Sequence, residues 1–150
     1  MKKKNRFTPP PILEFFRPEK VKHIELDLYT NTISAGFPSP AEDFLDKKLD
    51  LNDYLIKNPS ATFFVKVNGN SMINAGISDG DILIVDRSLE PSDGKVVIGI
   101  INGEFTVKRI VKKGKKIFLK PENENFKPIE IIEDMDFKIW GVVAYTIHKI

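Results

Sequence analysis

The stretch KVVIGIINGEFTVKRIV, Lys95–Val111, decides the fold class of this chain. Two runs rich in Val, Ile and Phe flank Asn102-Gly103, a dipeptide that favours the two-residue turn of a β-hairpin because both residues tolerate positive φ. The sequence therefore predicts two antiparallel strands, Lys95–Ile101 and Glu104–Val111, joined by a tight turn.

Four more runs of β-branched and aromatic residues predict further strands, at Ala61–Val67, Asp81–Asp86, Lys116–Lys120 and Phe137–Lys149. Asn68-Gly69, Asp79-Gly80 and Asp93-Gly94 separate them with typical turn residues. This spacing predicts a mainly β domain, curled and mostly antiparallel, with turns on which chemistry can be mounted.

The N-terminal region differs in pattern. Residues 1–35 lack a sustained hydrophobic period, Pro9–Pro11 favour polyproline geometry, and Pro18 disrupts any regular element around it. We interpret residues 1–35 as an extended arm and residues 36–150 as the β-domain. Between Ser34 and Pro40, small residues and two prolines predict an open, accessible backbone.

Two short helices are expected after this accessible segment. Ser39, Pro40 and Glu42 form a capping-box pattern, and the apolar residues after them share one helical face: Ala41, Phe44, Leu45 and Leu49. Asp50 is the predicted cap of a second helix that includes Leu51, Tyr54 and Leu55 and stops at Asn58-Pro59.

Composition sets further limits. A chain of 150 residues, 41% hydrophobic and 29% charged, suits one soluble domain with a tail. The absence of cysteine excludes disulfides and thiolate metal sites and fits the cytoplasm. No apolar stretch approaches the roughly 20 residues of a membrane span. Pro9–Pro11 and Glu14 interrupt any signal-peptide core after the basic start, so we do not expect export.

The charge is unevenly distributed. Residues 1–35 contain seven Lys/Arg and four Asp/Glu, whereas residues 36–150 contain sixteen and seventeen. Domains that grip phosphates usually carry a strong basic excess, so the nearly neutral β-domain argues against nucleic acid as its main ligand.

Ser71 and Lys108 are the residues most informative about chemistry. Ser71 lies in the turn Gly69-Asn70-Ser71-Met72, and Lys108 lies within the apolar run Glu104–Val111. A serine hydroxyl needs a base to become a nucleophile, and a lysine can be that base if apolar surroundings keep its amine neutral. Taken singly, however, each residue fits a plainer interpretation, as a turn serine and as a lysine on an exposed strand edge.

Other polar clusters support weaker hypotheses. Asp79, Asp81 and Asp86 lack a calcium-loop spacing and are interpreted as solvated turn residues. His23 and His148 have no ligand-like neighbours in sequence. Lys112–Lys116 is interpreted as a solvated hairpin tip that discourages edge pairing, and the same solvated interpretation applies to Lys2–Lys4. Trp140 and the phenylalanines are expected in the core.

A set of motifs in fixed order extends the signal beyond two residues. It comprises Gly36–Ala41, Asp50–Asn52, Pro59–Thr62, Phe64–Lys66, Gly69–Ile73, Gly76–Asp81, Leu83–Asp86, Asp93-Gly94, Gly103–Lys108 and Phe137–Val143. Together these motifs resemble the LexA/UmuD family of self-cleaving Ser-Lys peptidases, over essentially residues 36–150. The arm matches that family poorly and is judged by position only.

The resemblance implies roles for particular residues. It makes Ser71 the nucleophile and Lys108 the general base and later acid, and it places the scissile bond at Ala35-Gly36. The backbone N–H groups of Ser71 and Met72 would stabilise the oxyanion. Alanine stands before the scissile bond here, as in LexA-type repressors, whereas UmuD-type proteins can carry cysteine. The resemblance implies no cofactor and no metal.

The resemblance also implies partners. A RecA filament on single-stranded DNA would promote the cut, and the shortened homodimer would then serve a Y-family, UmuC-like translesion polymerase subunit in the SOS response. Neither a membrane nor sequence-specific DNA is an expected partner. A LexA-type repressor would need a helix-turn-helix domain before the peptidase part, and a signal peptidase would need a membrane anchor. A non-cleaving interaction module of the same fold, which binds a polymerase or another SOS protein, remains open as the alternative.

Overall fold

The computed structural model describes residues 13–16, 23–29, 35–38 and 45–150. The chain divides into two compact units, one of residues 1–18 with 58–150 and the other of residues 19–57.

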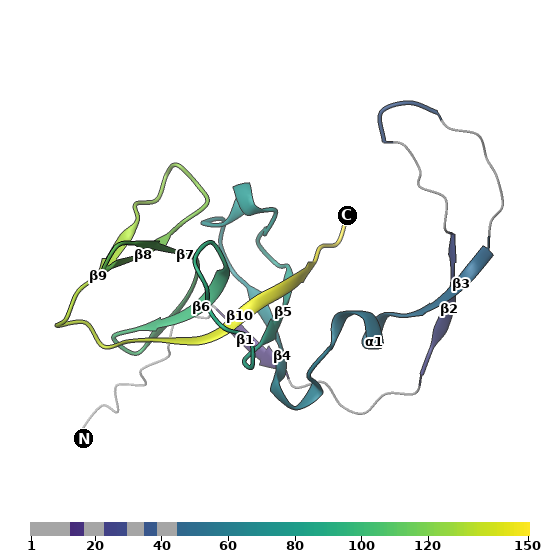
Figure 1. Cartoon of the computed structure of the whole chain (residues 1–150). Helices are drawn as coiled ribbons and strands as arrows, with labels where there is room; N and C mark the ends of the chain where they lie inside the picture. Colours follow the sequence, from purple (N-terminus) through teal and green to yellow (C-terminus); the bar gives the residue numbers. More distant parts are fainter. Residues whose placement is uncertain (1–12, 17–22, 30–34, 39–44) are drawn as a thin grey trace, which may run out of the picture. The chain divides into compact units, whose positions relative to one another are not determined.

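The larger unit is built on an eight-stranded sheet with the order β1-β4-β5-β10-β6-β7-β8-β9 (Figure 1). Every strand pairing in its described residues is antiparallel. The strands are β1 (Leu13–Phe16), β4 (Thr62–Val67), β5 (Ile82–Asp86), β6 (Val96–Ile101), β7 (Glu104–Lys113), β8 (Lys116–Lys120), β9 (Ile129–Ile131) and β10 (Phe137–Ile147). The predicted mainly β, antiparallel architecture is therefore confirmed.

The hairpin predicted at Asn102-Gly103 is present. Both residues have positive φ, 49° at Asn102 and 83° at Gly103, as a two-residue hairpin turn of the I′ type requires. Ile101 pairs with Glu104 across this turn, and the ladder continues to the pair Val96 and Arg109. The register fixes which residues of β7 lie opposite β6, and thereby the position of Lys108.

The centre of the sheet is the long strand β10, which pairs with β5 on one side and β6 on the other (Figure 1). Its register shifts between Ile139 and Gly141 and again between Val143 and Tyr145. Such bulges bend a strand and increase its twist, so one strand can serve two differently oriented neighbours.

Two groups of buried apolar side chains form the core. The first contains Val65, Val67, Met72, Ile77, Leu83, Val85, Ile98 and Val107, and the second contains Val97, Ile110, Leu119 and Val142. The first group includes Met72, which follows Ser71, and Val107, which precedes Lys108, so burial of apolar surface fixes the backbone next to each member of the candidate dyad.

The smaller unit contains β2 (Glu25–Tyr29), β3 (Leu45–Asp50) and the helix α1 (Leu51–Leu55), and β2 pairs with β3. The helix begins as predicted: the Asp50 carboxylate accepts a hydrogen bond from the Asn52 amide at 2.8 Å, which satisfies one free N–H of the first turn. None of the helices in the described part of the chain is long and apolar enough to span a membrane.

The prediction of a helix after Ser39 is wrong for residues 45–50, which the structure describes. Leu45–Asp50 is a strand, and its pairing with β2 brings Leu49 opposite Leu26. Cross-strand pairing has overridden the helical spacing of the apolar residues, since propensity is weak beside tertiary contacts. Residues 39–44, with Ser39, Pro40, Ala41, Glu42 and Phe44, lie outside the described residues.

The N-terminal arm is less featureless than its sequence indicates. Leu13–Phe16 pairs with β4 at the edge of the main sheet, and Glu25–Tyr29 forms β2. The short strand β9 was also not predicted, because Ile129–Ile131 is a three-residue run without flanking turn dipeptides. The division of the chain at residues 35 and 36 remains a prediction.

Candidate active site

Ser71 lies in the turn between β4 and a short 3-10 helix, Ile73–Ala75. Gly69 has φ of 102° and its amide donates to the Asp79 carboxylate at 2.7 Å, which closes the loop that carries Ser71. Backbone hydrogen bonds from Gly80 to Val67 and from Val67 to Asp81, each 2.8 Å, fasten the base of this loop. The serine therefore projects from a loop whose two ends are fixed.

Lys108 lies in the middle of β7, opposite Val97 on β6. The pairing of β7 with β8 begins one residue later, at Arg109. On the neighbouring position of β7, Val107 is buried in the first core group. Lys108 is thus held on a strand whose backbone is fixed by one neighbouring ladder and by the core.

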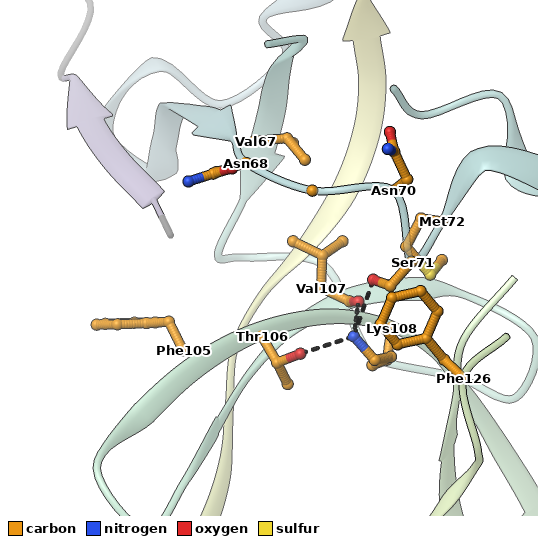
Figure 2. A pocket seen from close by; sticks show the side chains of 11 residues that line it. Val67, Asn68, Asn70, Ser71, Met72, Phe105, Thr106, Val107, Lys108 and Phe126 are labelled. Carbon is orange, nitrogen blue, oxygen red and sulfur yellow. Dashed lines mark hydrogen bonds between the residues drawn. The ribbon is translucent and has the colours of Figure 1, made fainter. Parts of the chain in front are cut away.

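The structure brings Ser71 and Lys108 together. The Lys108 Nζ lies 3.1 Å from the Ser71 Oγ, and it also lies 2.9 Å from the Thr106 Oγ1 and 2.9 Å from the Val107 carbonyl oxygen. Figure 2 shows the three side chains of Ser71, Thr106 and Lys108 converging from the turn and the strand. Thr106 was not predicted as a site residue, although alternation along the strand places it on the same face as Lys108.

Burial lowers the pKa of Lys108 below its ordinary value, because removing an ammonium from water favours the neutral amine. A neutral amine has two N–H donors and one lone pair. Val107 and Thr106 supply two oxygen acceptors, which leaves the lone pair for the Ser71 hydroxyl. The geometry and the lowered pKa together suit an amine that accepts a proton from serine.

A cleft of about 220 Å³ surrounds this pair. Its lining residues are Val67, Asn68, Gly69, Asn70, Ser71, Met72, Phe105, Thr106, Val107, Lys108 and Phe126 (Figure 2). Among the described residues, neither the Ser71 nor the Met72 amide donates a hydrogen bond to a backbone acceptor. These two amides therefore have no backbone acceptor in the described part of the chain, and both residues line the cleft.

Ala35 and Gly36 belong to an exposed bend over residues 35–37. Within the described ranges, no heavy atom beyond the adjoining residues lies within 4 Å of the position that a Cβ on Gly36 would occupy. The backbone around the predicted scissile bond is therefore accessible, as the small residues and prolines indicated. This bend belongs to the smaller unit, whereas Ser71 and Lys108 belong to the larger one.

The interpretation of the aspartates as solvated turn residues is wrong for two of them. Asp81 and Asp86 are only 3% and 5% exposed, whereas Asp79 is exposed. Burial alone would raise the pKa of Asp86, but hydrogen bonds from Asn58 and Ser88 outweigh it and hold that pKa below its usual value. These carboxylates tie loops to strand ends.

His148 also has a partner that its sequence neighbourhood did not reveal. Its Nδ1 lies 2.6 Å from the Asp81 Oδ1, and Thr146 and the Ser78 amide bind the other carboxylate oxygen. Burial opposes ionisation of Asp81, but these hydrogen bonds prevail and lower its pKa. The contact joins the end of β10 to the turn before β5.

His23 lies beside two carboxylates of the smaller unit. The ligand atoms of His23, Asp50 and Asp53 lie within 4.8 Å of one another. Both Asp50 oxygens already accept hydrogen bonds, one from Asn52 and the other from Ile24 and His23. We interpret the group as the cap of α1 and assign no metal to it.

The aromatic residues divide between core and surface. Trp140 is half-buried and packs edge-on against Phe63 and Phe105. The expectation of buried phenylalanines is wrong for Phe37 and Phe126, which are 80% and 49% exposed. The lysines of the 112–116 hairpin tip are exposed, as predicted.

A serine hydroxyl in hydrogen-bond contact with a desolvated amine, at the wall of a cleft, is an arrangement of hydrolases that attack with serine. Comparison with known proteins agrees with this class. The family model described as Peptidase S24-like matches residues 27–144, and the chain belongs to this family.

Relatives with known names are similar over most of the chain. Protein MucA of Salmonella typhimurium is 43% identical over 123 residues, which cover 81% of this chain and 84% of the relative. Protein SamA of the same species is 45% identical over 122 residues, with 81% and 84% covered. The LexA repressor of Acidithiobacillus ferrooxidans is 44% identical over 115 residues, 75% of this chain but 56% of that protein.

Proposed function

We propose that this chain is a UmuD-like protein of the SOS response that cuts its own backbone at Ala35-Gly36, with Ser71 as nucleophile and Lys108 as base. The single observation that carries the proposal is the 3.1 Å contact between the Lys108 Nζ and the Ser71 Oγ. The lowered pKa of Lys108 supports it, because only the unprotonated amine can accept the serine proton.

The first chemical step is attack on the Ala35 carbonyl. Neutral Lys108 takes the proton of the Ser71 hydroxyl as the Oγ forms a bond to the carbonyl carbon. The carbonyl oxygen becomes an oxyanion, and the backbone N–H groups of Ser71 and Met72 are the proposed donors that stabilise it. Their freedom from other described backbone acceptors supports this assignment.

The next steps release both products. The C–N bond to Gly36 breaks while the Lys108 ammonium returns its proton to the leaving amine. Water then attacks the ester between Ala35 and Ser71, with Lys108 again as base, and frees the alanine carboxylate. The products are an arm of residues 1–35 and a domain of residues 36–150 that begins with Gly36. No cofactor and no metal take part in this scheme.

Thr106 and Val107 have a supporting role in the same scheme. Their oxygens accept the two N–H groups of the neutral amine, at 2.9 Å each, and so direct its lone pair at Ser71. When Lys108 is protonated, both contacts persist, and the third N–H donates to the serine oxygen or the leaving amine.

We infer a switch rather than digestion as the biological purpose. The relatives MucA and SamA, similar over most of the chain, support an accessory role in SOS mutagenesis. In this proposal a RecA filament on single-stranded DNA stimulates the cut, and the shortened homodimer joins a Y-family, UmuC-like translesion polymerase subunit in the cytoplasm. Neither a membrane nor sequence-specific DNA is a partner.

The test is the mass of the purified chain after incubation with RecA filaments on single-stranded DNA. The parent chain is expected to yield two fragments that meet at Ala35-Gly36, whereas Ser71→Ala and Lys108→Ala stay intact. Exposed residues provide matched controls, Ser92→Ala and Lys115→Ala, which are expected to cleave like the parent. An intact parent would favour the non-cleaving interaction module, and cleavage of Ser71→Ala would refute the nucleophile.

A further inference from the structure

The turn that carries Ser71 is fastened to a loop after β8, residues 121–126. The Glu122 amide donates to the Ser71 carbonyl oxygen at 2.9 Å, and the Glu122 carbonyl accepts from the Asn74 amide at 2.8 Å. The Asn123 side-chain amide donates to the Asn70 carbonyl at 2.8 Å. Glu122 thus brackets Ser71 and the first residues after it through its own backbone.

The side chain of Glu122 connects the same loop to the strand that carries Lys108. Its Oε1 lies 2.6 Å from the Nε of Arg109, the residue after Lys108. The two side chains are 32% and 19% exposed for Arg109 and Glu122, so water screens this ion pair only in part. Arg109 also donates to the Gly94 carbonyl at 2.6 Å, which anchors it before β6.

These contacts connect Ser71 to Lys108 independently of the direct hydrogen bond between their side chains. The connection runs from the Ser71 carbonyl to the Glu122 backbone, through the Glu122 carboxylate to Arg109, and along β7 to Lys108. Ser71 lies in a loop without ladder pairing, so its distance from Lys108 depends on the contacts that hold that loop. The hydrogen bond between Arg109 and Glu122 is ionic, and such a bond is about twice as strong as a neutral one. It is therefore well suited to hold the loop that carries Ser71.

We propose that Glu122, fixed by Arg109, is a positioning residue that keeps the Ser71 hydroxyl against the Lys108 amine. The inference rests on the proposed self-cleavage, since it assigns the pair a role in that reaction. Displacement of a reacting group by about 1 Å can cost about 100-fold in rate. Loss of the Glu122 carboxylate is therefore expected to slow self-cleavage by about 10-fold or more.

The test uses a reporter that does not depend on cleavage. The chain contains no cysteine, so Ser71→Cys introduces a single thiol at the dyad. A free thiol has a pKa of about 8.5, and a neighbouring lysine lowers it. The rate of alkylation by iodoacetamide against pH reports this pKa. Adding Lys108→Met should return it to about 8.5, which shows that the lysine causes the shift.

In the Ser71→Cys background, Glu122→Ala is expected to raise the thiol pKa by about half to one unit. Alkylation at neutral pH then slows by about 3- to 10-fold, because the thiolate fraction falls. Arg109→Met should have the same effect, and the double variant should show little more than either change alone. Glu122→Gln keeps an acceptor for Arg109, so its thiol pKa should lie between those of Ser71→Cys alone and of Ser71→Cys with Glu122→Ala. Glu124→Ala, an exposed carboxylate of the same loop, is the matched control.

The outcomes separate the two proposals. A thiol pKa unchanged by Glu122→Ala or Glu122→Gln in folded protein, or one raised equally by Glu124→Ala, overturns the positioning role while leaving the dyad intact. A thiol pKa of about 8.5 in Ser71→Cys itself overturns the dyad and this inference with it. A pKa that depends on Lys108 and Glu122 in a chain that never cleaves supports the positioning and refutes only the proposed function.

Discussion

Replacement of Gly141 by alanine is expected to destabilise the larger unit. Gly141 lies beside the first bulge of β10, where this strand pairs with both β5 and β6. A Cβ at this position would lie 2.6 Å from the Val85 Cγ1 and 3.2 Å from the Arg87 Cγ. Carbon atoms normally approach to about 3.5–4.0 Å, so the overlap with Val85 is about 1 Å.

The cost arises from the surroundings of Val85, which is completely buried in the core group that also contains Met72 and Val107. Valine has few accessible rotamers, and close packing in a protein core opposes a change of rotamer. Overpacking of this kind typically costs about 1–3 kcal/mol. Alanine gains about 0.5–1 kcal/mol over glycine within a strand, so subtracting this gain from the middle of that range leaves an expected net loss of about 1 kcal/mol.

The assay is equilibrium unfolding in urea, followed by the fluorescence of Trp140, the single tryptophan. Gly99→Ala is the matched control in the same sheet. A Cβ there would approach the tips of Phe137 and Leu119 at 3.3 and 3.4 Å, distances that small side-chain shifts can relieve. We expect a net change near zero for Gly99→Ala. Equal unfolding free energies for Gly141→Ala and the parent would refute the packing argument.

Three further predictions concern buried charged groups. Asp86→Ala should cost about 2–3 kcal/mol in urea unfolding, because Asn58 and Ser88 lose their acceptor; a loss below about 0.5 kcal/mol would contradict this. Folding lowers the pKa of Asp81 and of Asp86, so both carboxylates stabilise the folded chain fully above the unfolded pKa of about 3.9. This stabilisation is lost as the pH falls through their folded pKa values. A free energy of unfolding that does not decrease in acid would contradict this prediction. The pKa of Lys108 in the folded chain lies below its unfolded value of about 10.4. Between these two pKa values the unfolded chain binds more protons than the folded chain, so the free energy of unfolding should rise with pH in this range, relative to Lys108→Met. A pH-independent difference between those two proteins would exclude a desolvated amine.

The sequence predicted the β-domain well because its signals are local. Glycine-containing turn dipeptides and runs of β-branched residues locate six strands to within a few residues, and Asn102-Gly103 sets the hairpin that aligns β7. The cap at Asp50 is equally local and is confirmed. Each of these features depends on a few adjacent residues and their backbone preferences.

Contacts between residues far apart in the sequence could not be predicted from these local signals. The apolar spacing through Leu45 and Leu49 suits a helix, yet this segment forms β3 because β2 is available as a partner. Asp81 is surrounded by turn residues in sequence, but it is buried and its hydrogen-bond partners include Thr146 and His148, more than 60 residues away. Local spacing cannot reveal a partner that only the folded chain supplies.

The site shows the same division. Ser71 and Lys108 could be singled out because their residue types and their motifs are informative together. Thr106 was within reach, since alternation along a strand places it beside Lys108. The pair of Arg109 and Glu122 could not be predicted from the sequence, because its connection to the site depends on the contact between the 121–126 loop and the Ser71 turn in the folded chain.

The most direct test of the central claim is the rate of self-cleavage of the folded chain against pH, without RecA and with Lys108→Met as comparison. If Lys108 is the base, the parent rate should increase about tenfold per pH unit while the amine is mostly protonated, and reach a plateau above its lowered pKa. Lys108→Met should remain uncut throughout. A parent rate that is flat from neutral to strongly alkaline pH in folded protein, or cleavage of Lys108→Met at the parent rate, would contradict the account.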